Sequence, residues 1–199
     1  AGAYQALNKD DKALEYYKKA LAKNPENSEL TYSIGAIYAN MQNYEEARKY
    51  FMNAVKLNPS NLMAKDGLAD MNDILSQGNV VEAARLIDSK NYTEALAMLD
   101  KAISICPNNA DAYYYKGSVY DAQSKPQQAI ESYKKSLEYN KNHDVTYYLI
   151  AIDYENMNNP KEALEYYKKF LEVYKTNDEY SQYVKARIPE IEADLNPKQ

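Results

Sequence analysis

A motif that recurs about every 34 residues constrains the fold of this chain more than any other feature of its sequence. The segment "DDKALEYYKKALAKNPENSE" returns as "NYEEARKYFMNAVKLNPSNL", "NYTEALAMLDKAISICPNNA", "KPQQAIESYKKSLEYNKNHD" and "NPKEALEYYKKFLEVYKTND". Each copy has a central alanine, at Ala13, Ala47, Ala95, Ala129 and Ala163. Four residues later comes a bulky residue, at Tyr17, Phe51, Leu99, Tyr133 and Tyr167. Such self-similarity predicts a stack of similar structural units.

A second helical segment precedes most of these alanines. It carries a small residue, at Gly35, Ala83, Gly117 and Ala151. Three residues later comes a large one, at Tyr38, Leu86, Tyr120 and Tyr154. Small residues at this spacing let two helices approach closely, so each unit is predicted to be a pair of antiparallel amphipathic helices. Pro126 and Pro160 are predicted to start second helices, because a first-turn N–H has no intrahelical partner.

The repeated positions resemble those of the tetratricopeptide repeat over about residues 1 to 175. The resemblance implies an all-α fold: a right-handed superhelical solenoid of antiparallel helix pairs, here closed by a carboxyl-terminal capping helix. The aromatic residue that opens the family's first helix is kept at Tyr113 and Tyr147 but is Thr31 and Asn79 in two units. The first three units close with a proline, at Pro25, Pro59 and Pro107, and the last two have Lys141 and Lys175 there instead.

The period fails between Ala47 and Ala95, where the interval is 48 residues, 14 more than the repeat. The extra length fits either two helices, near 62–76 and 80–89, or one long or kinked helix over about 62–89. The single helix is favoured, because an odd number of helices would reverse the alternation of the units. The predicted division is therefore 1–61 (first repeats), 62–90 (connecting helix), 91–175 (last repeats) and 176–199 (capping helix and tail).

The two ends of the chain carry different expectations. At the start, Tyr4 matches Tyr38, so half of a first helix is missing and further repeats or another domain are expected before residue 1. At the other end, one helical stripe predicts a capping helix, with Tyr180, Val184, Ile188, Ile191 and Leu195 on it. Pro189 is expected to kink or split that helix.

Composition and charge narrow the class of protein. Net charge is −5, and lysines alternate with glutamates, which disfavours nucleic-acid binding. The sequence contains no run of about 18 apolar residues, so we expect no membrane insertion. The cellular compartment is not predicted. His143, the one histidine, lies between two units and is interpreted as a solvated turn residue, and Cys106 is the only cysteine. Without a nucleophile–base pair, a metal cluster or a cofactor fingerprint, we expect no enzyme activity, metal or cofactor.

The resemblance also implies a concave groove lined by the first helices, which in the family accepts a peptide or a partner's helix. The family's clamp for a carboxylate end uses Lys, Asn and Arg there. The matching residues are Glu29, Tyr32, Ser33, Ala36, Asp111, Tyr114, Tyr115, Ser118, Val145, Tyr148, Leu149 and Ile152. None of them is Lys, Asn or Arg, so a chaperone-tail adaptor is disfavoured.

We predict instead a tyrosine-rich groove with an acidic rim, which suits an apolar to mildly basic protein segment. Its residues are Tyr32, Ala36, Asp111, Tyr114, Tyr115, Ser118, Asp121, Tyr148, Ile152 and Glu155. The competing interpretation is that these tyrosines only fill space between helices. The predicted function is a non-catalytic interaction scaffold. The alternatives are a self-associating module, and the interaction part of a longer enzyme or transport-machinery protein.

Overall fold

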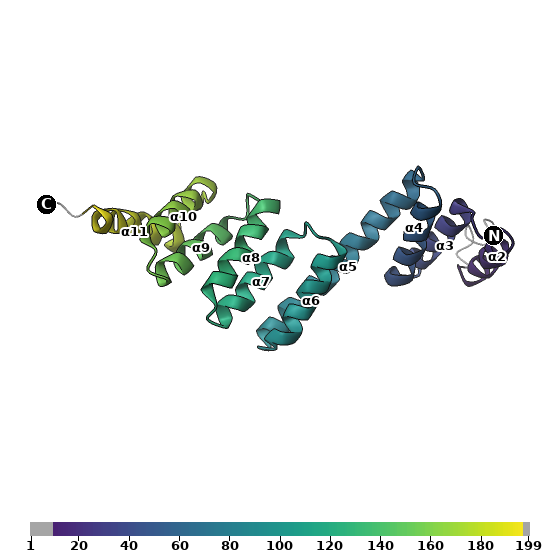
Figure 1. Cartoon of the computed structure of the whole chain (residues 1–199), viewed down its shortest axis with the longest axis horizontal. Coiled ribbons are helices and arrows are strands. Elements are labelled where there is room, and N and C mark those ends of the chain that lie inside the picture. Colours follow the sequence, from purple (N-terminus) through teal and green to yellow (C-terminus); the bar gives the residue numbers. More distant parts are fainter. Residues whose placement is uncertain (1–9, 197–199) are drawn as a thin grey trace. The chain divides into compact units, whose positions relative to one another are not determined.

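All regular secondary structure in the described residues is helical. The structure is a computed structural model and describes residues 10–196. Within that range, helices α2 to α11 are joined by short connections and no strand occurs (Figure 1). The all-α repeat fold expected from the sequence is confirmed. The chain forms two compact units: residues 1–78, unit 1, and residues 79–199, unit 2.

The helices follow the repeat. Unit 1 contains α2 (Asp10–Lys23), α3 (Ser28–Asn40), α4 (Tyr44–Leu57) and the first part of α5 (Leu62–Asp88). Unit 2 contains the rest of α5 with α6 (Tyr92–Ile105), α7 (Ala110–Ala122), α8 (Pro126–Tyr139), α9 (Asp144–Asn156), α10 (Pro160–Val173) and α11 (Glu179–Leu195). The two helices of a repeat pack on each other in the pairs α3–α4, α7–α8 and α9–α10.

Local chemistry fixes where many of these helices begin. The Asn27 side chain accepts a hydrogen bond from the Leu30 N–H at 2.8 Å. The Asn109 side chain accepts one from the Ala112 N–H at 3.0 Å. Such caps satisfy N–H groups that have no partner inside the helix. Pro126 and Pro160 begin α8 and α10 as predicted.

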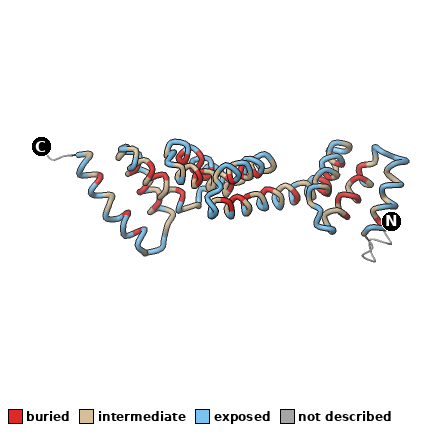
Figure 2. Tube along the Cα trace, turned by 90° about the horizontal axis from the view of Figure 1, so that it is seen from below, coloured by how far each residue is buried: buried red, intermediate tan, exposed pale blue. Residues whose placement is uncertain are grey.

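The alanine of each repeat lies at a helix crossing. All five central alanines have 0% of their surface exposed: Ala13, Ala47, Ala95, Ala129 and Ala163. The bulky residues four positions later are buried at Phe51, Leu99, Tyr133 and Tyr167, whereas Tyr17 is half-buried. In Figure 2 the buried residues recur along the helices with exposed residues between them, as expected for amphipathic helices.

The long interval in the repeat is bridged by one helix. α5 runs from Leu62 to Asp88 without a break, so of the two arrangements the structure has the long helix. Gly78 is exposed on it, and a Cβ added there would meet nothing within 4 Å. The boundary between the two units follows Gly78, inside the segment that the sequence sets apart as 62–90.

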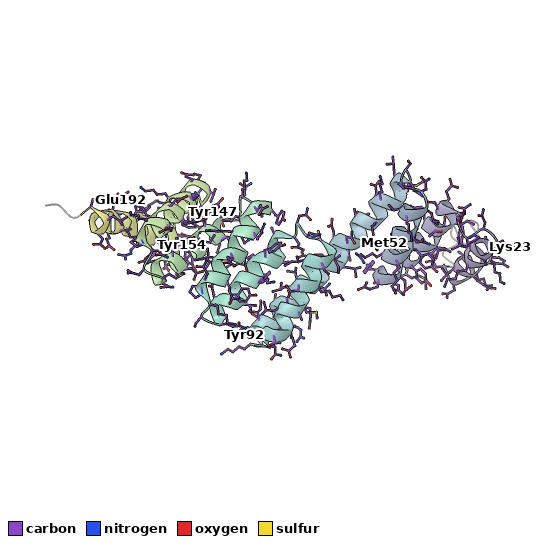
Figure 3. The ribbon with its side chains drawn as sticks, viewed as in Figure 1. Lys23, Met52, Tyr92, Tyr147, Tyr154 and Glu192 are labelled. Carbon is purple, nitrogen blue, oxygen red and sulfur yellow. The ribbon has the colours of Figure 1, made fainter. Side chains whose placement is uncertain are left out.

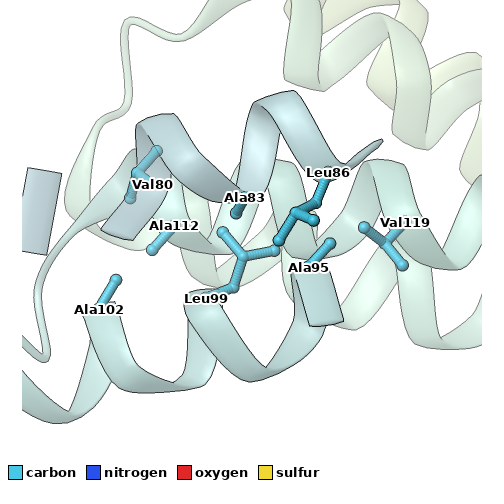
Figure 4. Close-up of a cluster of buried hydrophobic side chains, with 8 residues drawn as sticks. All are labelled: Val80, Ala83, Leu86, Ala95, Leu99, Ala102, Ala112 and Val119. Carbon is cyan, nitrogen blue, oxygen red and sulfur yellow. The ribbon is translucent and has the colours of Figure 1, made fainter. Parts of the chain in front are cut away.

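The last part of α5 takes the place of a first helix in unit 2. Val80, Ala83 and Leu86 pack with side chains of α6 and α7 in one hydrophobic cluster (Figure 4). Its other buried members are Ala95, Leu99, Ala102, Ala112 and Val119. The extra length of α5 therefore leaves the alternation of helices within unit 2 intact.

α11 covers the last helix pair. Val184 is 0% and Ile191 2% exposed against α10, as the predicted stripe requires. Tyr180 differs: it is 58% exposed and lies outside the buried stripe. Pro189 does not split α11, which continues to Leu195. Within residues 10–196, no helix is both long and apolar enough to cross a bilayer.

Candidate functional site

The predicted groove residues are divided between the two units. Tyr32 and Ala36 lie on α3 in unit 1, where both pack against the cluster of Phe51 and Met71. The Tyr32 and Phe51 rings are 5.5 Å apart. The other predicted residues lie on two neighbouring first helices of unit 2. On α7 these are Asp111, Tyr114, Tyr115, Ser118 and Asp121, and on α9 they are Tyr148, Ile152 and Glu155.

Tyr114 and Tyr115 are half-buried and contact each other edge to face, with ring centroids 5.3 Å apart. Tyr115 packs on the cluster of Leu99, and Tyr114 packs on that of Tyr133. Burial is the main cause that raises the pKa of Tyr114. Both tyrosines therefore contribute to packing between helices as well as to the surface.

His143 is half-buried against Tyr114, so its interpretation as a solvated turn residue is wrong. It is half-buried, and its ring meets Tyr114 edge to face at 4.6 Å. Its Nδ1 is also hydrogen-bonded to the Thr146 hydroxyl. The connection before α9 places His143 against Tyr114 of α7. The sequence shows no pattern that links these two residues.

Tyr148 forms the centre of a second aromatic group that joins α9, α10 and α11. Its ring lies 5.6 Å from those of Phe170 and Tyr180 and 6.4 Å from that of Tyr183. A cavity of about 360 Å³ opens beside it, which we call the apolar cavity. Its lining consists of Val145, Tyr148, Leu149, Phe170, Tyr174 and Tyr180.

Helix α9 also packs on α10 through further tyrosines. The rings of Tyr147 and Tyr154 lie 6.4 and 5.7 Å from the ring of Tyr166. Figure 3 labels Tyr147 and Tyr154 among the side chains. Tyr154 also accepts a hydrogen bond from Lys134 of α8 at 2.7 Å. These tyrosines are explained by packing between helices, unlike the exposed Tyr180.

Two acids of the predicted rim are held by buried tyrosine hydroxyls. The Tyr133 hydroxyl donates to Asp121 at 2.5 Å, and the Tyr167 hydroxyl donates to Glu155 at 2.7 Å. Glu155 also accepts from Arg187 of α11, with an Nη2–Oε1 distance of 2.6 Å. The pKa of each tyrosine is raised well above its usual range. Burial is the main cause, and the hydrogen bond to the acid is the second. Glu155 is therefore already paired and leaves less free negative charge on the rim than the sequence suggested.

A spacing in the sequence could have revealed these pairs. Asp121 and Glu155 each precede their tyrosine by 12 residues. Where the bulky position is Phe51 or Leu99, the residue 12 earlier is Ala39 or Ile87. At the four buried bulky positions an acid therefore accompanies the hydroxyl and is absent without it, as the rule that buried polar groups are hydrogen-bonded requires. The half-buried Tyr17 has Gln5 at this spacing.

Replacing Tyr133 by phenylalanine is expected to lower the free energy of unfolding by about 1–3 kcal/mol, because the half-buried Asp121 loses its donor. Tyr167→Phe is expected to cost less, since Glu155 keeps Arg187. Urea unfolding followed by circular dichroism measures both. Tyr139, 42% exposed on α8, is the matched control, and Tyr139→Phe should stay within about 0.5 kcal/mol of the parent. Equal losses at Tyr133 and Tyr167 would contradict this account.

Asp153 is a buried acid that the sequence interpretation missed. It is 6% exposed on α9 and lines a second cavity, of about 460 Å³, together with Asp121 and Ile152. We call it the acidic cavity; its remaining lining is Ser124, Lys125, Pro126, Leu149 and Asn156. Burial and then the charge of Asp121 raise the pKa of Asp153 to about 8. Burial also raises the pKa of Asp121, although the Tyr133 hydroxyl opposes the shift.

Comparison with known proteins identifies the family. Models of the tetratricopeptide repeat match residues 1–29, 29–61, 110–143 and 145–177. A further model, described as TPR repeat, matches residues 84–124. Together they follow the copies found in the sequence and the helix pairs of the structure. The chain belongs to the tetratricopeptide repeat family.

The curated relatives match this chain over only a small part of their own length, and the solved structures share only the fold. Protein O-mannosyl-transferase TMTC1 of Homo sapiens is 27% identical over 161 residues, 69% of this chain and 18% of that protein. The chain spans less than a third of the length of the curated relatives that it matches. The crystal structure of yeast Tom70 is 18% identical, with a TM-score of 0.54, over 92% of this chain and 43% of that one. The first TPR of Spaghetti (RPAP3), bound to an HSP90 peptide, is 16% identical with a TM-score of 0.54, over 61% and 93%.

Proposed function

We propose that this chain is a non-catalytic protein-interaction module. Its tyrosine-bearing surface on α7, α9 and α11 binds an extended or helical segment of a partner protein. The apolar cavity carries this proposal, because its wall holds side chains that water reaches. Tyr180 is 58% and Val145 42% exposed there. Tyrosine provides large contact area with little loss of rotamer freedom, which suits a recognition surface.

The charge around this surface favours an apolar to mildly basic segment. The chain carries a net charge of −5, and Asp121 and Asp153 lie in the acidic cavity. Leu149 lines both cavities, so an apolar anchor and a basic side chain could occupy neighbouring sites. The predicted residues Asp111, Ser118, Ile152 and Glu155 belong to the same proposal. Tyr32 and Ala36 of unit 1 are proposed as a separate contact.

Selection of peptides against the intact chain tests the proposal without a known partner. Peptides of about 12 residues displayed on phage are expected to be enriched in apolar and aromatic anchors. Their affinity for the double variant Val145→Ser, Tyr180→Ala should fall at least tenfold, because the exposed wall of the apolar cavity is lost. Tyr139→Ala is the matched control, since Tyr139 is 42% exposed in the same unit and does not line that cavity.

The exposed pair is a sharper probe than Tyr114 and Tyr148, whose rings also support their neighbours. No enrichment, or equal binding by the double variant and the parent, would contradict the proposal. A mass that rises with concentration, abolished by the same double variant, would favour a self-associating module instead.

A second candidate follows from the length of the relatives. This chain matches 18% of a human mannosyl-transferase and 14% of another. Repeats of this family can thus form one part of a much longer protein. The second candidate is therefore that this chain is the interaction part of a longer enzyme or transport-machinery protein. Peptide binding by the chain is expected under either candidate.

A further inference from the structure

Asp153 places a carboxyl group where two other first helices, α3 and α7, bury an aliphatic side chain, whereas α5 has the exposed Arg85 at that position. The residue two positions after the small residue of the first helix is Ile37 in α3 and Val119 in α7, each 0% exposed. Asp153 holds the same position in α9, two residues after Ala151, and is 6% exposed. A carboxyl group is unfavourable at such a position unless a partner satisfies it.

The carboxyl pair has acceptor oxygens to spare. Asp153 Oδ2 and Asp121 Oδ1 are buried and receive no donor from outside the pair, while the two carboxyl groups hydrogen-bond to each other. The Tyr133 hydroxyl donates its hydrogen bond to the other oxygen of Asp121, Oδ2. Lys125 lines the same cavity, but its ammonium group donates to Gln123 at 2.7 Å. Among residues 10–196, no ion pair joins Lys125 to either aspartate.

In the free chain, a proton held by the two carboxyl groups removes one of their negative charges. Burial and the neighbouring carboxylate raise the pKa of Asp153, so one of the two acids stays protonated near neutral pH. The groups that face the pair are Tyr133 from α8 and Lys125 from the turn before it. A cation that enters the acidic cavity can therefore replace this proton and pair with both carboxylates.

We propose that Asp121 and Asp153 bind the guanidinium group of an arginine side chain. This inference rests on the proposed function, because the bound protein segment carries that arginine. A guanidinium group presents several N–H donors in a planar fork, which can serve two carboxylates at once. Leu149 and Ile152 line the same cavity and offer apolar surface to the arginine stem. Two carboxylates alone fall short of the six or more oxygen ligands that calcium takes.

Titration of N-acetyl-arginine amide into the full chain tests the arginine site directly. Nuclear magnetic resonance of the aspartate carboxyl carbons reports binding, and N-acetyl-citrulline amide is the matched probe of similar shape without charge. The arginine compound is expected to shift Asp121 and Asp153 together and to bind at least tenfold more tightly than citrulline. Its affinity should rise between pH 6 and 8, by up to about tenfold per unit, because binding releases one proton.

Two variants separate the site from general electrostatics. Asp153→Asn is expected to weaken binding at least tenfold and to remove the pH dependence. Asp194→Asn, on the exposed side of α11, should change neither. Circular dichroism verifies that both variants are folded.

Several outcomes would overturn the inference. They are equal responses to arginine and citrulline, tighter binding of N-acetyl-lysine amide or of calcium, and an affinity that is independent of pH. None of these probes requires the apolar cavity. Peptide selection can therefore succeed while the arginine site fails, so failure of this inference is distinguishable from failure of the proposed function.

Discussion

Replacing Gly117 by valine is expected to lower the free energy of unfolding by about 3 kcal/mol. Gly117 is buried where α7 crosses α8, and a Cβ built there would lie 2.5 Å from two ring carbons of Tyr133. That ring is 1% exposed and its hydroxyl is tied to Asp121, so it has little room to move aside. Side chains forced into a packed core cost about 1–3 kcal/mol, and the branched valine falls at the upper end.

Gly78 is the matched control for this experiment because it differs from Gly117 only in its surroundings. It also lies within a helix, its φ is not positive, and a Cβ there meets nothing within 4 Å. Gly78→Ala is therefore expected to raise the free energy of unfolding by about 0.5–1 kcal/mol through helix propensity. The two substitutions should thus have opposite signs.

Urea unfolding followed at 222 nm measures both changes. Repeat arrays can unfold in parts, so hydrogen exchange of the peptides covering α7 and α8 should accompany the measurement. Loss of protection is expected there for Gly117→Val. The next repeat has Ala151 and Tyr167 at the equivalent positions, so valine is a more decisive test than alanine. An unchanged midpoint for Gly117→Val would show that the helix crossing adapts to the added side chain.

The periodic part of the sequence predicted the fold closely because the same packing problem recurs in each repeat. The central alanines are all buried, and the small residues Gly35 and Gly117 lie under the rings of Phe51 and Tyr133. The single helix over the irregular interval was also predictable, since it alone preserves the alternation of helices. Position in a repeat thus determines which side chains face the core.

The candidate site was less predictable, because its decisive contacts join positions that differ between repeats. Asp153 occupies a position that is aliphatic and buried in α3 and α7 but holds the exposed Arg85 in α5, so the repeat alone does not predict its burial. Tyr180 follows the apolar stripe of α11 yet is 58% exposed, since α11 covers only one helix pair. His143 meets Tyr114 only through the fold of a turn. Such contacts depend on three-dimensional placement that the period does not encode.

The second large effect is a pH dependence of stability caused by the Asp121–Asp153 pair. An unfolded aspartate has a pKa of about 3.9, whereas that of Asp153 in the folded chain is raised to about 8. Between these values the folded chain keeps a proton that the unfolded chain has lost. The contribution of this pair to stability is therefore full below about pH 4 and falls as pH rises toward 8, by at most about 1.4 kcal/mol per unit.

Asp153→Val should remove this dependence and stabilise the chain at pH 8. Valine is the residue found fully buried at the equivalent position of α7, Val119. Exchanging a buried carboxyl group for a well-packed apolar side chain is expected to raise the free energy of unfolding by about 1–4 kcal/mol. Asp121 keeps the Tyr133 hydroxyl as its donor, so the variant leaves that acid with a hydrogen bond.

Urea midpoints at pH 5, 6.5 and 8, at one ionic strength, provide the measurement. Surface acids such as Glu15, Glu82 and Glu165 have lowered pKa values through their Lys or Arg partners, so their contribution to stability is lost only at more acidic pH. The chosen window therefore lies above the pH range in which these surface acids lose their contribution, and the difference between the parent and Asp153→Val isolates the buried aspartate from the other titratable groups. Asp194→Val, at an exposed position of α11, should keep the slope of the parent chain. Parallel pH profiles for the parent and Asp153→Val would mean that Asp153 carries no shared proton in the folded chain, and a less stable variant at pH 8 would mean that its carboxyl group is already satisfied.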